Sequence, residues 1–220
     1  MLPLLAQGDA VSRFVAAALL LMSVASWVVI LWKSALLWRA RRHLPRSLAA
    51  FWQAPGLAEA ERQLLAFDPA RLLLPLVSAG RSALGQPAAS LAGQGDLRQQ
   101  LTRLLRDALH GVLHRLQYGQ ILLASVGATA PFVGLLGTVW GIYHALAGLG
   151  ASGDGSLRIE QISGPVGEAL IMTAFGLAVA IPAVLAYNAL GRQVAQIEAE
   201  LEGFAHDLRE LLAASPAEAP

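Results

Sequence analysis

The sequence has no cysteine and few charged residues, and both shortages narrow what the protein can be. Without cysteine there is no disulfide, no thiol nucleophile and no cysteine-ligated metal. Asp, Glu, Lys and Arg make up 14% of the chain, whereas soluble domains carry about 25%. Hydrophobic residues make up 55%, and the net charge of +1 gives no overall attraction for nucleic acid. The composition therefore indicates a chain for which lipid is part of the solvent.

Motifs for catalysis or cofactor binding are also missing. Lys33 is the only lysine, and it lies outside any Walker sequence. His110 and His114 share a helix face, but no third metal ligand accompanies them. The glycines at 148, 150 and 153 match a dinucleotide fingerprint by spacing alone, because they follow an apolar helix rather than a strand. We therefore expect no enzyme activity, no cofactor and no metal site.

Three apolar stretches are long enough to cross a membrane. A crossing helix needs roughly 20 residues because the hydrocarbon core is about 30 Å thick. The first covers residues 14–32, the second lies within 116–153, and the third runs from about 165 to 190 with Glu168 as its one charge. In lipid every backbone polar group must be bonded internally, which favours helices. The sequence thus predicts an all-α integral membrane protein with three transmembrane helices.

The basic residues predict how these helices are oriented. Twelve of the 16 Lys and Arg residues lie from Lys33 to Arg115, against Arg13 before the first span and Arg158 between the other two. Positive charge favours the cytoplasm. The basic residues follow the first apolar run instead of preceding it, so we expect a retained helix rather than a cleaved signal. The predicted order is an outer N-terminus (1–13), a span (14–38), a cytoplasmic helical region (39–117), a span (118–150), an outer loop (151–164), a span (165–190) and a cytoplasmic helix and tail (191–220).

The cytoplasmic region is predicted to form short helices and then one long helix. Breaks are expected at Pro45, Pro55-Gly56, Pro69, Pro75 and residues 85–95. From Asp96, a good N-cap, an amphipathic helix is expected to continue without interruption into the second span. Its apolar stripe consists of Leu97, Leu101, Leu104, Leu105, Ala108, Leu109, Val112 and Leu116.

The C-terminal helix is also amphipathic. Its apolar residues are spaced alternately three and four apart, as in a coiled-coil seam. They are Val194, Ile197, Leu201, Phe204, Leu208 and Leu211. The seam suits either packing on the Asp96 helix and neighbouring subunits or lying on the chain's own bundle, and the pattern fits both equally.

Small residues line one face of each of the last two spans. The second span carries Gly127, Gly134, Gly141 and Gly148 at seven-residue intervals, with Gly137 between them. The third span carries Ala169, Thr173, Gly176, Ala180 and Ala183. Helices in lipid associate through close backbone packing at small residues. Two such faces exceed what a single three-helix monomer needs, so self-association is expected beside intrachain packing.

Three polar residues inside the spans are candidates for function, because polar groups are costly in lipid. They are Thr138, Glu168 and Thr173. Each has a simpler explanation. A threonine can bond a preceding helical carbonyl, and Glu168 suits the start of a helix capped by Ser163. Glu168 and Thr173 lie about 140° apart on an ideal helix, so they do not share a narrow face.

Two segments resemble signatures of a known family. APFVGLLGTVWGI (residues 130–142) is similar to the second-span signature of the ExbB, TolQ and MotA family, and GPVGEALIMTAFGLAVAIPAVLAYN (residues 164–188) is similar to its third-span signature. The topology fits the family along the whole chain, although residues 39–117 are only loosely alike. His144, Arg158 and Glu160 depart from the family pattern without altering the core assignment.

The resemblance implies a bacterial inner-membrane homopentamer whose outer face is periplasmic. The ring would enclose helices of an ExbD-like partner, which supplies a membrane aspartate that accepts protons. Proton flow would act through a TonB-like protein on the import of iron siderophores and vitamin B12. Residues matching Thr138, Glu168 and Thr173 line the ring interior in the family. Two alternatives stay open, a TolQ-type subunit of an envelope-constriction system and a scaffold that conducts no ions.

Overall fold

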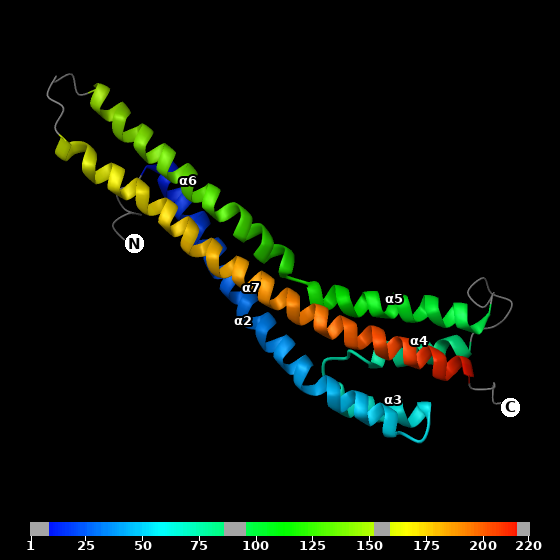
Figure 1. The fold of residues 1–220 in the computed structure, drawn as a ribbon. Helices are drawn as coiled ribbons and strands as arrows, with labels where there is room; N and C mark the ends of the chain where they lie inside the picture. Colours follow the sequence, from blue (N-terminus) through cyan, green and yellow to red (C-terminus); the bar gives the residue numbers. More distant parts are fainter. Residues whose placement is uncertain (1–8, 86–95, 152–158, 215–220) are drawn as a thin grey trace. The chain divides into compact units, whose positions relative to one another are not determined.

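The computed structural model describes residues 9–85, 96–151 and 159–214, and all regular structure within these ranges is α-helical (Figure 1). The helices are α2 (Ala10–Gln53), α3 (Leu57–Phe67), α4 (Leu74–Leu84), α5 (Leu97–Gln117), α6 (Gln120–Ala151) and α7 (Ile159–Ala214). Helices α2, α6 and α7 each contain an apolar stretch long and hydrophobic enough to cross a membrane. The predicted all-α class with three candidate spans is confirmed.

The chain separates into two compact units. The first, here called the span unit, is Met1–Trp32 with Gly119–Ala189. The second, the bundle unit, is Lys33–Tyr118 with Leu190–Pro220. Helices α2 and α7 each contribute residues to both units, so a single helix changes its packing environment along its length.

The expected uninterrupted helix from Asp96 into the second span is wrong. Helix α5 ends at Gln117 and α6 begins at Gln120, and Gly119 between them has a φ of 86°, a left-handed conformation that glycine adopts at little cost. The Lys33 Nζ donates hydrogen bonds to the carbonyl oxygens of Tyr118 (2.6 Å) and Arg115 (3.4 Å). A cation bonded to the last carbonyls of a helix stabilises its end. The carbonyl of Tyr118 at this helix end is thus bonded by a residue 85 positions away in sequence.

The expected break at Pro45 is wrong, whereas Pro55-Gly56 and Pro69 lie between helices as expected. Pro45 lies inside α2, and α7 begins before Pro165 and so includes it. A proline removes one backbone hydrogen bond, and the exposed side of α2 at Pro45 leaves the freed carbonyl within reach of water. Ser163 lies within α7 and therefore does not stand at its N-cap position. The expected break at Pro55-Gly56 does separate α2 from α3, and Pro75 stands in the first turn of α4.

The bundle unit has a core of large aliphatic and aromatic side chains. The stripe of α5 is buried at Leu101, Leu105, Leu109, Val112 and Leu116. On α7 the predicted seam is buried as far as Leu208, but its last member is Leu212 (4% exposed) rather than Leu211 (45%), because the helical repeat favours the fourth residue after Leu208. Phe204 of α7 packs edge-on against Phe51 of α2, with ring centroids 4.9 Å apart. The seam therefore packs within its own chain, and packing on neighbouring subunits stays a prediction.

A buried carboxylate organises the turn between α3 and α4. Asp68 is 5% exposed and accepts hydrogen bonds from the backbone N–H groups of Leu72, Leu73 and Leu74 at 2.8–3.0 Å. Those groups at the start of α4 have no carbonyl partner within the helix. Asp68 thereby caps α4 from outside it, a role that no local sequence pattern indicated.

Candidate ion-pathway site

Helices α6 and α7 approach most closely where two glycines face each other. The Cα atom of Gly176 lies 3.1 Å from the position that a Cβ on Gly134 would take, and a Cβ on Gly176 would lie 2.6 Å from the carbonyl oxygen of Ala130. Neither position has room for a side chain. Such contact between backbones is the means by which apolar helices associate in lipid.

The rest of this contact follows an antiparallel register. A Cβ on Gly127 would lie 2.5 Å from the side chain of Val184, and one on Gly141 would lie 2.8 Å from the Cβ of Ala169. As the position rises along α6 it falls along α7, in agreement with the two ribbons in Figure 1.

The remaining seam residues fall into two groups. A Cβ on Gly137 would meet Met172 of α7 and Val15 of α2 at 2.9 and 3.0 Å, so this glycine faces two helices. Ala169, Ala180 and Ala183 are buried. Gly148 differs, since nothing lies within 4 Å of its added Cβ in the described part of the chain. The structure therefore places six of the nine predicted seam residues in close helix contacts and buries Ala180 and Ala183, whereas an added Cβ on Gly148 meets no described residue.

The two predicted threonines meet inside this contact. Thr138 is 5% exposed, and its Oγ1 donates to the carbonyl oxygen of Leu135 at 2.7 Å. The Oγ1 of Thr173 donates to Thr138 Oγ1 at 3.4 Å, a long hydrogen bond. Hydroxyls both donate and accept but do not ionise near neutral pH. The pair can therefore bond a passing water or a carboxylic acid, but it cannot itself carry a charge.

Glu168 lies on a different face from the threonine pair. It is exposed on α7, whereas Thr173 is half-buried against α6, as the angle of about 140° between them requires. Helix α7 starts at Ile159, so Glu168 stands in the third turn and no longer qualifies as a residue of the helix start. A carboxylate exposed by the single chain inside a span needs water or another protein chain beside it.

Large apolar side chains cover the outer faces of the same two helices. Phe132 and Val139 of α6 and Leu185 of α7 are 71, 59 and 65% exposed. Helices α6 and α7 thus place small residues at their contact and expose many large apolar ones, although Leu123 and Met172 are buried. This exposed surface suits lipid or further subunits as surroundings.

Two features of the span unit were not anticipated from the sequence. The Trp140 Nε1 of α6 donates to Asp9 Oδ2 at 3.1 Å, and this hydrogen bond, with one from the Ala10 N–H, lowers the pKa of Asp9. Ser26 of α2 is buried, and its hydroxyl has no hydrogen-bond partner among the described residues. A carboxylate directly before an apolar run is a recognisable cap signal, but its indole partner lies 131 residues away.

Comparison with known proteins identifies the family. The model of the MotA/TolQ/ExbB proton channel family matches residues 79–203, which include the α6–α7 contact. The chain belongs to this family. The biopolymer transport protein ExbB of Xanthomonas campestris pv. campestris is 45% identical over 217 residues, covering 94% of this chain and 83% of that protein.

Other relatives extend the comparison. The ExbB protein of Neisseria meningitidis serogroup A is 40% identical over 203 residues, covering 91% of each chain. The Tol-Pal system protein TolQ of Pseudomonas aeruginosa is 29% identical over 211 residues, covering 95% of this chain and 90% of that protein. The chain is therefore a membrane protein of a proton-channel and transport family, with greater similarity to these ExbB proteins than to this TolQ protein.

Proposed function

We propose that this chain is the ring-forming subunit of a proton-driven inner-membrane motor of the ExbB kind and has no enzymatic activity. The observation that carries the proposal is the threonine pair, Thr138 and Thr173, held by glycine packing inside a span unit that belongs to a proton-channel family. Five copies would place these hydroxyls and Glu168 along a central passage. The identities of 40 and 45% to ExbB proteins, against 29% to TolQ, favour the ExbB role.

The motor needs a second protein, because neither threonine hydroxyl is hydrogen-bonded to an ionisable group in the described part of the chain. Glu168, the one carboxylate of the predicted spans, lies on another face of α7. An ExbD-like partner with a membrane aspartate would supply the group that takes up and releases the proton, and the hydroxyls would hydrogen-bond its neutral and charged forms. A TonB-like protein would then transmit the work to import of siderophores and vitamin B12.

The proposed orientation follows the distribution of basic residues. The N-terminus and residues 151–164 would face the periplasm, and the bundle unit would face the cytoplasm, because the Lys and Arg residues concentrate between Lys33 and Arg115. Glu168 would then lie near the periplasmic end of its span, and the threonine pair would lie deeper in the membrane.

The test replaces the polar groups one at a time and follows siderophore uptake driven by the proton motive force. Thr173→Ala and Glu168→Ala are each expected to lower uptake at least about tenfold, which is the loss that a free-energy change of 1.4 kcal/mol produces. Assembly should stay intact. Thr129→Ala is the matched control, because Thr129 is exposed on α6 and donates to the Ser125 carbonyl of its own helix.

The same variants decide between this proposal and a scaffold that conducts no ions. The scaffold is a genuine rival because small-residue seams require only packing. Full uptake in both variants, with complexes of normal mass, would favour the scaffold. The TolQ alternative is tested by complementation of two strains, one lacking ExbB and one lacking TolQ. If the chain fails to restore uptake in the first but restores envelope constriction in the second, it is a TolQ-type subunit.

A further inference from the structure

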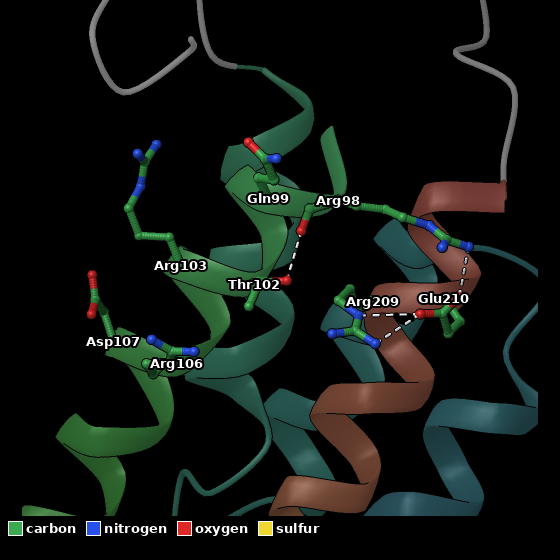
Figure 2. Close-up of a pocket in the computed structure, with 8 residues that line it drawn as sticks. All are labelled: Arg98, Gln99, Thr102, Arg103, Arg106, Asp107, Arg209 and Glu210. Atoms are coloured by element: carbon green, nitrogen blue, oxygen red, sulfur yellow. Dashed lines mark hydrogen bonds and ion pairs between the residues drawn. The ribbon is translucent and has the colours of Figure 1, made fainter. Parts of the chain in front are cut away.

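A groove rich in arginine runs between α5 and α7 within the bundle unit. Its upper part is a hollow of about 560 Å³ lined by four guanidinium groups and only two carboxylates. The lining residues are Arg98, Gln99, Thr102, Arg103, Arg106, Asp107, Arg209 and Glu210 (Figure 2). We call this feature the arginine groove. Its lining has an excess of positive charge, which attracts anionic groups.

Two arginines of the groove already bind a carboxylate of the same chain. The Glu210 carboxylate of α7 forms ion pairs with Arg98 of α5 and with Arg209 of α7, each at 2.9 Å (Figure 2). The pair with Arg98 links the two helices. Arg106 is exposed and forms no ion pair with any residue that the structure describes. Among the described residues, Arg106 is thus a guanidinium group of the groove without a carboxylate partner, and it can bind a carboxylate of another molecule.

The groove continues beyond this hollow and becomes partly apolar. A second hollow of about 270 Å³ shares Thr102, Arg106 and Arg209 with the first. Its lining also includes Leu105 and Leu109 of α5. Glu202 also lines this second hollow, so the whole groove carries four arginines and three carboxylates, and Leu105 and Leu109 show only small surfaces in it (3 and 8% exposed).

The length of the groove decides what kind of ligand fits. From Arg98 to His110 it follows α5 for about 18 Å, at 1.5 Å per residue. An extended peptide rises about 3.3 Å per residue, so five or six residues would fill it. A single phosphate group is much shorter and would fill only a small part of the groove.

We propose that the arginine groove binds an extended acidic segment of a partner protein, with carboxylates on Arg106 and its neighbours and an apolar side chain against Leu105 and Leu109. The inference goes beyond the proposed motor function and does not depend on it. Binding requires neither a proton gradient nor the threonine pair, so each proposal can fail alone.

The test uses the purified full chain in lipid nanodiscs and a fluorescein-labelled octapeptide of alternating Glu and Leu. This peptide is expected to bind at least about tenfold more tightly than its Gln–Leu counterpart at low salt, and its affinity should fall as salt screens the charges. Arg106→Glu should weaken binding about tenfold. Arg41→Glu is the matched control, since Arg41 is exposed on α2 outside the groove, and it should change affinity less than twofold.

Several results would overturn the proposal. Equal affinity for the acidic and neutral peptides would remove its electrostatic basis, and equal effects of Arg106→Glu and Arg41→Glu would remove the site. Displacement by tripolyphosphate at concentrations below those of the peptide would identify a phosphate site instead. Because the chain has no cysteine, Arg106→Cys gives a unique thiol. Efficient bismaleimide cross-linking of two copies through it would show that a second copy occupies the groove.

Discussion

The span unit and the bundle unit follow opposite packing rules, and α7 follows both. Up to Ala189 the helix turns small residues such as Gly176 and Ala183 inward and exposes large ones such as Leu185. From Leu190 onward it buries large residues such as Leu201 and turns polar residues outward. In water, burial of large apolar groups drives packing, whereas in lipid it offers no gain and close backbone contact takes its place. This change of packing along α7 is the one expected where a membrane span ends.

The strongest test of this contrast is a large residue in the small-residue contact. Gly176→Leu should abolish the α6–α7 packing, because even its Cβ would lie 2.6 Å from the Ala130 carbonyl oxygen. Overpacking usually costs 1–3 kcal/mol, and a clash with backbone should cost about 3 kcal/mol or more. Thermal unfolding in detergent measures the loss. Gly148→Leu is the control, because no described residue lies within 4 Å of its added Cβ, and equal destabilisation by both would contradict the contrast.

The converse substitution tests the bundle unit. Leu201→Ala should lower the free energy of unfolding by about 2–4 kcal/mol, because it removes a fully buried side chain and leaves a cavity. Leu211→Ala, at a site 45% exposed on the same helix, should cost under about 1 kcal/mol. The comparison of the two midpoints in denaturant checks the prediction. Similar losses would mean that this part of α7 is not packed as a water-soluble core.

A smaller loss of stability is expected from a change at Lys33, the first residue of the bundle unit. Lys33→Met should destabilise the protein by about 1–3 kcal/mol, because the Tyr118 and Arg115 carbonyls at the end of α5 lose their donor. Removing a buried cation also removes its desolvation cost, which acts in the opposite direction. A variant as stable as the parent would show that desolvation offsets the hydrogen bonds. Differential scanning calorimetry of both proteins measures the balance.

The smallest expected effect concerns pH at the end of the span unit. The hydrogen bond from Trp140 lowers the pKa of Asp9 in the folded protein, so the stabilisation is fully present above the ordinary pKa of about 3.9 and is lost as pH falls through the lower folded value. Trp140 fluorescence should change in that acidic range. Asp9→Asn should abolish the transition, and its persistence in this variant would assign it to another group.

Much of the fold was predictable because the decisive signals are local. Hydropathy located all three candidate spans, and the periodicity of α5 and α7 located most of the buried stripe. The break at Tyr118 and Gly119 was not predictable, because its donor, Lys33, lies far away in sequence. The continuity of α2 through Pro45 also depends on tertiary context that outweighs local propensity.

At the candidate site, too, local features were predictable and features that depend on distant residues were not. Glycine spacing predicted the α6–α7 contact, and the structure brings Thr138 and Thr173 together there. Spacing alone did not separate Gly148 from the packed glycines, because that depends on how far the facing helix extends. The angle between Glu168 and Thr173 predicted that they lie on different faces, but what surrounds Glu168 depends on other chains.

The buried position of Lys33 makes it a chemical reporter. It carries the only side-chain amine of the protein, and that amine is 0% exposed and hydrogen-bonded to the end of α5. Acylating reagents would modify it only when α2 and α5 separate locally. The rate of its acylation, followed by mass spectrometry, would therefore time the opening of this junction in the native protein without any engineered label.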